Sequence, residues 1–365
     1  MKTKKTHQLY LPHELILQIL LSLPVKSLLR FKCVCNSWFS LISDPHFANS
    51  HFEITTATHT HRLMFISDAD RETRSVDFEA SLHDDSAISV SHNLNFLLPK
   101  PYHNLEIIGS CRGIIGMRRC SEFHLWNPST GVHKQIPFSP DHRYLNFFGF
   151  GYDKSTDDYL VISMSDDYLE FFSLRANMWK QIESTHICYT YLDKDDFTSG
   201  VGLLFNGAIH WLAFHRDHDL KEFVIVAFDL TERKLLDMQL PHDCDPKLHN
   251  SDLWVFGEFL SLWSTDFRKN NTVEIWVMNE YKLHSSWTKT IVLPIDGFPD
   301  EYMVPLCSTK SGDIVRTDYC CTGLAKYDGK GQLLEYRSHR NCYPYDVYEV
   351  TLYIESLLSP HNEQA

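Results

Sequence analysis

Near its start the chain repeats apolar residues at spacings of three and four, a pattern typical of an amphipathic helix. The first helix that this spacing predicts contains Leu15, Ile16, Ile19, Leu20 and Leu23. Pro12 suits the first turn of that helix, where a missing N–H leaves no hydrogen bond unmade, and Pro24 ends it and can begin the next one. Apolar patterns over 25–34 and 37–42 predict two further helices, the last of which ends before Pro45.

These three helices have more apolar surface than they can bury among themselves. Leu17 and Leu21 leave the first helix apolar on more than one face. A unit of about forty residues is too small to enclose that surface. We therefore expect a second protein or a second domain to cover it.

From about Arg62 the pattern changes to short runs of alternating or β-branched apolar residues, separated by Gly, Asn, Asp and Pro. Helical periodicity of any length disappears, which predicts an all-β body. Similar strand-and-turn segments recur in it at steps of 49, 46, 56, 48 and 51 residues. The residues that mark these steps are Asp77, Trp126, Phe172, Phe228, Trp276 and Tyr327. A repeat near 50 residues with about four strands is the size of one propeller blade.

This repeat predicts six blades, with seven as the alternative because the first copy is faint. Several copies continue into a short amphipathic strand, and three of these close in Pro: HKQIP (133–137), LDMQLP (236–241) and TKTIVLP (288–294). The tail 348–360 predicts one more strand, with Leu357 as the last residue on its apolar side. Pairing this strand into the N-terminal blade would close the ring and leave no free sheet edge.

The composition adds constraints on class and compartment. With 43% apolar residues in a length of 365, the chain is rich enough to form a packed globular core. Apolar runs such as 15–21 fall short of the ~20 residues that span a bilayer, so no transmembrane helix is expected. The start of the chain also lacks the cleavage site of a secretory signal. The ten cysteines, at irregular spacing, are then expected to stay reduced in the cytoplasm or nucleus.

Charge divides the chain into a basic front and an acidic body. Residues 1–50 hold six Lys and Arg against two acidic residues, a net charge of +4. The remaining 28 basic and 45 acidic residues give −17. An acidic body repels phosphate backbones, which argues against nucleic acid as a partner. Two modules of opposite charge favour two different partners.

No residue pattern predicts a catalytic, cofactor or metal site. Cys33-x-Cys35, Cys320-Cys321 and His242-Asp243-Cys244 lack the paired spacing of a structural zinc site. No nucleophile elbow and no paired carboxylates accompany the 21 histidines, so a propeller enzyme or lectin is disfavoured. Acidic clusters are typical of solvated loops, but several on one propeller face would steer a basic substrate. These clusters lie at 153–158, 166–167 and 193–196.

The opening stretch LPHELILQILLSLPVKSLLRFKCVCNSWFSLI (11–42) resembles the F-box. Asn36 and Phe39 depart from the commonest pattern, which has Lys or Arg at the first position and a polar or basic residue at the second. The resemblance implies that this unit binds the acidic Skp-type adaptor of a cullin-RING ubiquitin ligase, which suits its net charge of +4. The residues expected to contact the adaptor are Leu11, Pro12, Leu15, Ile19, Leu20, Leu23, Pro24, Val25 and Leu28.

The rest of the chain resembles the F-box-associated, kelch-like domain of plant F-box proteins. The motifs that carry this resemblance are GSCRGIIGM (109–117), LWNPSTG (125–131), FGFGYDKSTDDYLVI (148–162), GAIHWLA (207–213), IVAFDL (225–230) and YIESLLSP (353–360). In that family the β body captures a protein substrate and the F-box ties it to the ligase. The resemblance thus implies a non-catalytic substrate-recognition subunit of an SCF ubiquitin ligase. The alternative is an F-box-bearing scaffold that captures its target without promoting ubiquitination.

Together these patterns predict an α+β chain of two domains. A three-helix F-box is expected over 1–48, a linker over 49–61 and a kelch-like propeller over 62–365. The residues that bind the substrate are not predicted, because blade loops vary while the ring stays rigid.

Overall fold

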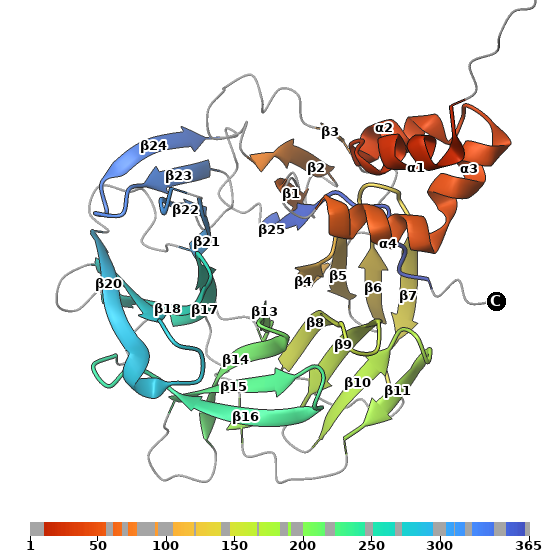
Figure 1. Cartoon of the computed structure of the whole chain (residues 1–365). Helices are drawn as coiled ribbons and strands as arrows, with labels where there is room; N and C mark the ends of the chain where they lie inside the picture. The colour runs from red at the N-terminus through yellow and green to blue at the C-terminus, as the bar shows by residue number, and fades with distance from the viewer. Residues whose placement is uncertain are drawn as a thin grey trace, which may run out of the picture.

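The computed structural model places four helices beside a ring of six β-sheets within the residues that it describes (Figure 1). Those residues are 11–55, 61–67, 72–78, 92–93, 105–119, 122–139, 147–165, 168–182, 189–190, 200–215, 223–244, 251–266, 272–294, 304–309, 311–317, 323–338 and 348–361. The helices are α1 (His13–Leu21), α2 (Val25–Phe31), α3 (Asn36–Ser43) and α4 (Pro45–Ile54).

Helix α4 is an addition to the three predicted helices. Pro45, expected to follow the last helix, is instead the first residue of α4, where proline is well tolerated. The Asp44 carboxylate caps this helix by accepting hydrogen bonds from the backbone N–H groups of His46 at 2.7 Å and Phe47 at 3.2 Å. Since α4 continues to Ile54, the first part of the expected linker is helical.

Each sheet forms one blade, and we number the blades 1 to 6 along the chain, with strands given from the ring centre outward. Blade 1 consists of β25 (Tyr348–Ile354), β1 (His61–Ser67), β2 (Glu72–Asp77) and β3 (His92–Asn93). Blade 2 consists of β4 (Glu106–Cys111), β5 (Ile114–Arg119), β6 (Glu122–Trp126) and β7 (His133–Pro137). Blade 3 consists of β8 (Phe147–Asp153), β9 (Asp158–Met164), β10 (Leu169–Ser173) and β11 (Met178–Gln181).

The second half of the ring repeats this arrangement. Blade 4 consists of β12 (Tyr189–Thr190) and β13 (Leu203–Phe205), both paired with β14 (Ala208–His215), then β15 (Phe223–Asp229) and β16 (Lys234–Gln239). Blade 5 consists of β17 (Ser251–Phe256), β18 (Phe259–Asp266), β19 (Thr272–Met278) and β20 (Trp287–Pro294), with the 3-10 turn η3 (His284–Ser286) before β20. Blade 6 consists of β21 (Val304–Ser308), β22 (Ile314–Thr317), β23 (Gly323–Tyr327) and β24 (Leu333–Ser338).

The six-blade prediction is confirmed, and the sequence repeat has a structural meaning. All six residues that mark the repeat lie on the third strand of their blades: β2, β6, β10, β15, β19 and β23. The amphipathic segments that close in Pro belong to the outermost strands β7, β16 and β20. The C-terminal strand closes the ring as predicted, because β25 pairs antiparallel with β1, with Leu352 opposite Leu63.

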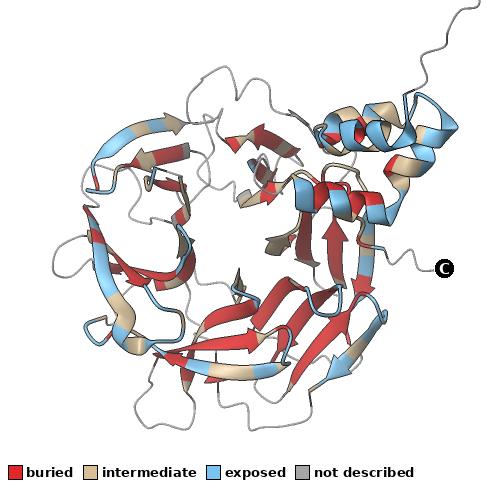
Figure 2. Cartoon of the chain, in the orientation of Figure 1, coloured by how far each residue is buried: buried red, intermediate tan, exposed pale blue. Residues whose placement is uncertain are grey.

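The core of the ring is divided into six apolar clusters, each between two neighbouring blades. Between blades 3 and 4, for example, Phe147 packs with Ile209 and Trp211, which are at most 2% exposed. Gly149 permits this close approach, since a Cβ atom there would lie 2.5 Å from Ile209 Cγ2. Figure 2 shows buried residues along the inner strands and exposed ones on the outer strands.

The ring has two distinct faces because the strands of a blade alternate in direction. The turns from β4 to β5, from β6 to β7 and from β8 to β9 lie on the side of the ring that carries α4, which we call the helix face (Figure 1). The strand ends that lead into the next blade, such as Pro137 and Gln181, lie on the other side, which we call the opposite face.

Candidate functional site

The helical domain, residues 11–55, has one side buried against the rest of the chain (Figure 2). Apolar side chains from all four helices meet there with two side chains that follow β25. The cluster consists of Leu20, Val25, Leu28, Ile42, Phe47, Ala48, Phe52, Leu357 and Leu358. The chain itself therefore covers part of the apolar surface that we expected to be in excess.

The other side of α1 is exposed. Leu11, Leu15 and Ile19 have exposed fractions of 48%, 47% and 52%, and their spacing of four places them on one face. Pro12 lies beside them as the N-cap residue of α1, and its carbonyl accepts hydrogen bonds from the N–H groups of Leu15 and Ile16 at 3.1 and 3.2 Å. We call Leu11, Pro12, Leu15 and Ile19 the α1 patch.

The nine positions expected to contact an adaptor are divided between these two sides. The exposed ones are the α1 patch and Pro24. Leu20, Val25 and Leu28 are at most 5% exposed, so their side chains stabilise the helical domain and cannot reach a partner. Leu23 is half-buried, and its carbonyl accepts a hydrogen bond from His51 Nε2 at 2.8 Å, which ties the α1–α2 turn to α4.

Two further apolar side chains are exposed, one between α2 and α3 and one in α3. Val34 and Phe39 have exposed fractions of 59% and 54%, and the free thiols of Cys33 and Cys35 are exposed near them. Phe39 stands where the F-box pattern commonly has a polar residue. The phenylalanine at this position is therefore the feature of the sequence that indicates an exposed apolar surface here. The nine positions expected to contact an adaptor include neither Val34 nor Phe39.

Arg112 fastens the helical domain to blades 2 and 3. Its guanidinium forms an ion pair with Glu53 of α4 at 2.9 Å and donates a hydrogen bond to Asn49 Oδ1 at 3.0 Å. The same group lies 4.6 Å from the ring centre of Phe52 in α4 and 4.2 Å from that of Tyr152 in β8. A cation held between two rings and an opposite charge makes a specific contact, because each partner constrains its direction.

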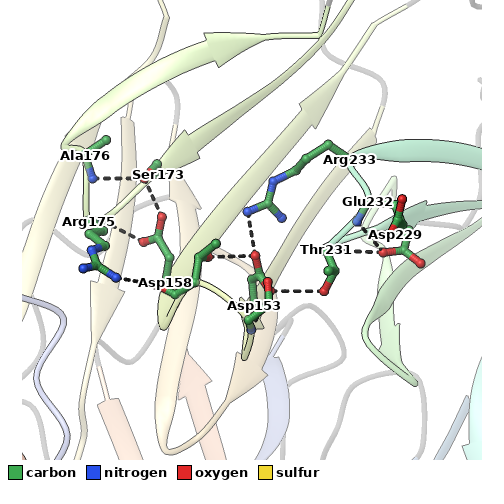
Figure 3. A network of polar contacts seen from close by, with 11 residues as sticks. Asp153, Asp158, Ser173, Arg175, Ala176, Asp229, Thr231, Glu232 and Arg233 are labelled. Atoms are coloured by element: carbon green, nitrogen blue, oxygen red, sulfur yellow. Dashed lines mark hydrogen bonds and ion pairs between the residues drawn. The ribbon is translucent and has the colours of Figure 1, made fainter.

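A polar network joins blades 3 and 4 on the helix face (Figure 3). Asp153 is 1% exposed and accepts hydrogen bonds from Ser155 and Thr156 of its own turn. It also accepts one from Thr231 at 3.1 Å and pairs with Arg233 at 2.8 Å, both in blade 4. Burial alone would raise the pKa of Asp153, but these hydrogen bonds and the Arg233 charge lower it to about 2.

Asp158 and Asp229 have similar roles in their own turns. Asp158 accepts hydrogen bonds from Ser173 Oγ and, at 2.7 Å, from the Arg175 backbone N–H. Asp229 accepts from the backbone N–H groups of Thr231 and Glu232, both at 2.9 Å. The carboxylates Asp153 and Asp158 of the first acidic cluster therefore stabilise the ring and do not form a steering surface. The clusters 166–167 and 193–196 lie outside the described residues.

Within the described ranges, no group of three or more His, Cys, Asp or Glu side chains is arranged to hold a metal ion. Cys320 and Cys321 lie outside those ranges. Over the same part of the chain, no helix is long and apolar enough to cross a membrane.

Comparison with known proteins assigns both parts of the chain. The family described as F-box domain matches residues 9–49, and the family described as F-box associated beta propeller domain matches residues 61–326. "F-box/kelch-repeat protein At3g23880" of Arabidopsis thaliana is 28% identical over 381 residues, covering 98% of this chain and 99% of that protein. "F-box protein CPR1" of the same plant is 28% identical over 381 residues, covering 95% of this chain and 88% of that protein.

The similarity to solved structures is low. A protein of unknown function from Bacteroides caccae has a TM-score of 0.43 at 8% identity, covering 81% of this chain and 99% of that chain. The sequence families are far more specific, because together they match most of the helical domain and all but the last part of the ring. The chain therefore belongs to the plant F-box proteins that carry an F-box-associated β-propeller.

Proposed function

We propose that this chain is the substrate-recognition subunit of an SCF-type ubiquitin ligase. In this role the F-box binds a Skp-type adaptor, and the propeller captures a protein for ubiquitination and degradation. The observation that carries the proposal is the α1 patch, which leaves large aliphatic side chains half exposed on a domain whose other side is buried. Exposed apolar clusters of this kind mark protein interfaces. F-box proteins with a propeller typically act as substrate receptors.

The contribution of this chain is then one of proximity. An adaptor surface and a target surface on one folded chain hold the target near the transferred ubiquitin, which raises its effective concentration. This role requires no catalytic group in the chain itself.

We also propose that the target binds the opposite face of the ring. The helix face is partly occupied by α4, and its turns are fixed by contacts such as that of Asp153 with Arg233. The opposite face carries the strand ends that lead from blade to blade, where connections such as 295–303 between β20 and β21 are longer than the β4–β5 and β8–β9 turns of the helix face. Loops of variable length on a rigid ring are suited to selective binding.

The double substitution of Leu15→Ala with Ile19→Ala tests the adaptor site. Each truncation of an aliphatic side chain at an interface centre costs about 2 kcal/mol, so we expect affinity for a purified plant Skp-type adaptor to fall more than about 100-fold. The matched control is Leu333→Ala with Leu334→Ala, which removes two leucines of similar exposure, 46% and 53%, from β24. Titration calorimetry measures both, and unchanged affinity in the Leu15 and Ile19 variant contradicts the assignment.

A reconstituted ligase then separates a receptor from a scaffold. The substrate is a protein recovered by proximity labelling both with the full-length chain and with the Leu15 and Ile19 variant, because that variant loses the adaptor site and keeps the propeller. Ubiquitination of that protein by the complete complex supports the receptor role. Stable capture without ubiquitin transfer would support the scaffold instead.

A further inference from the structure

The segment after β25 joins the helical domain to blade 2. It leaves the innermost strand of blade 1 at Ile354 and continues as residues 355–361. Leu357 and Leu358 are 8% and 5% exposed, and they complete the apolar cluster of the helical domain. Part of the F-box core is therefore supplied by residues some three hundred positions away in the sequence.

Asn127, in the β6–β7 turn of blade 2, binds the backbone of this segment. The Asn127 side chain is completely buried. Its Nδ2 group donates hydrogen bonds to the carbonyl oxygens of Ser356 at 3.0 Å and Leu358 at 2.7 Å, and also contacts Ser356 Oγ at 3.2 Å. Its Oδ1 accepts from the Ser129 N–H at 2.8 Å within the turn. Departure of the segment would break the hydrogen bonds of Asn127 Nδ2 to Ser356 and Leu358, which is unfavourable.

Residues of blade 2 leave space for the segment 355–361 and form hydrogen bonds with it. Gly113 has a φ of +80°, and a Cβ atom there would lie 2.4 Å from Ser356 Oγ and 2.6 Å from the Ile354 carbonyl oxygen. The Ser356 N–H donates to Ser129 Oγ at 3.3 Å, and His361 Nε2 donates to the His133 carbonyl oxygen at 3.0 Å. Contacts along the whole segment thus define a single path across blade 2.

These contacts and the Arg112 contact hold the F-box through two different parts of the chain. Arg112 binds α4 through an ion pair with Glu53 and a cation–π contact with Phe52. The segment 355–361 enters the apolar cluster that α4 forms with α1 and α2. The two sets of contacts adjoin at the β4–β5 turn, where Gly113 follows Arg112 and lies against Ser356. Together they restrict rotation of the domain more than the Arg112 contact does alone.

We propose that residues 355–361, with Asn127 as their receptor, are a positioning element that fixes the direction of the F-box relative to the ring. The effect on ubiquitin transfer rests on the function proposed above, whereas the effect on geometry does not. An F-box that swings about the Arg112 contact still presents the α1 patch, but it no longer holds the target at one distance from the ligase.

Two variants and one control test this positioning element. Asn127→Asp keeps the acceptor for Ser129 and replaces the donors with an oxygen that faces two carbonyl groups. Deletion of 356–365 removes the segment and keeps β25, and deletion of 362–365 is the matched control. Spin labels on click-reactive amino acids at Ser40 in α3 and Glu258 in blade 5, both exposed, report the distance between the two domains. This chemistry avoids labelling the exposed thiols of Cys33 and Cys35.

We expect one narrow distance distribution for the native chain and the control, and a distribution at least twice as wide for Asn127→Asp and for the deletion of 356–365. Adaptor affinity of Asn127→Asp should stay within about threefold of the native value, while ubiquitin transfer to a captured target falls severalfold. Thermal unfolding shows whether the deletion variant is folded. If it is not, the width of the distance distribution of Asn127→Asp alone tests the proposal. An unchanged, narrow distribution in the folded variants overturns the proposal. If the distribution widens but no variant, including the native chain, binds the adaptor, the proposed function fails and the positioning element stands.

Discussion

At the scale of single residues, the ring is held together by polar side chains that reach from one blade to the next. Trp179 of blade 3 donates its indole N–H to the Pro137 carbonyl oxygen of blade 2 at 2.9 Å. Trp287 of blade 5 donates in the same way to Gln239 of blade 4 at 3.1 Å. These repeated contacts supplement the apolar clusters between blades with directional ones, so neighbouring blades are fixed in register as well as packed.

At this scale we predict how the contribution of Asp153 to stability depends on pH. The pKa of Asp153 in the folded chain, about 2, lies below its ordinary value of 3.8. The ionised carboxylate therefore stabilises the fold fully at pH values above about 4. This stabilisation is lost as the pH falls from about 4 to about 2. We expect Asp153→Asn to lower the free energy of unfolding by about 2 kcal/mol at pH 7, and by less at pH 3.

Urea unfolding of the native chain and the variant at both pH values measures this difference. Asp243→Asn, at an exposed position between blades 4 and 5, is the control and should change stability little. A loss for Asp153→Asn that is as large at pH 3 as at pH 7 would show that the charge of Asp153 is not the cause.

Residue contacts of this kind were beyond prediction from the sequence. Asn127 was visible only as part of a turn motif, because its partners lie 229 and 231 positions later. The α1 patch was predicted, but its separation from Leu20, Val25 and Leu28 was not, since both sides of the helix are apolar. Which side is covered depends on α4 and on the segment after β25, and neither follows from local spacing.

At the scale of elements, the repeat pattern was the most informative part of the sequence. The third strand of each blade is marked by an aromatic or turn residue, and the outer strand by amphipathic alternation, because each occupies the same environment in every blade. The sequence does not predict helix α4, because Pro45 ends the apolar helical pattern, although Asp44 before it is a favourable N-cap. Strand β25 was predicted, but it ends at Ile354. Leu357 fits the apolar spacing of the strand, yet it lies beyond the strand and packs in the helical domain.

At the scale of elements we predict the effect on stability of deleting strand β25. Its removal leaves β1 with an unpaired inner edge and exposes the clusters on both sides of blade 1. We therefore expect deletion of 348–365 to lower the melting temperature more than deletion of 356–365, and to cause aggregation. Scanning calorimetry with light scattering compares the two deletions, and equal melting temperatures would contradict the ring-closing role of β25.

At the scale of the whole molecule, the two faces of the ring differ in what already covers them. The helix face is engaged by α4 and by residues 355–361, and its turns are joined across blades (Figures 1 and 3). An adaptor on the α1 patch would therefore meet the outer side of the helical domain, which leaves the opposite face accessible to a second protein. This division of surfaces permits simultaneous binding without competition.

Site-specific crosslinking tests this division. We expect a photoreactive amino acid at the exposed residue Gln181, on the opposite face, to crosslink to a captured target in the reconstituted complex. The same group at Glu258, exposed on the helix face, should give at least several times less product. Mass spectrometry of the adducts makes the comparison, and stronger crosslinking from Glu258 would place the target on the helix face.

The position of Leu357 and Leu358 in the F-box core has a consequence for biosynthesis. A ribosome makes α1 to α4 first and reaches these two leucines only after all six blades have been translated. Until then the nascent helices lack part of their interior, so their final packing waits for residues made after the blades. A stop codon just after β25 would thus damage helices that are encoded some three hundred codons before it.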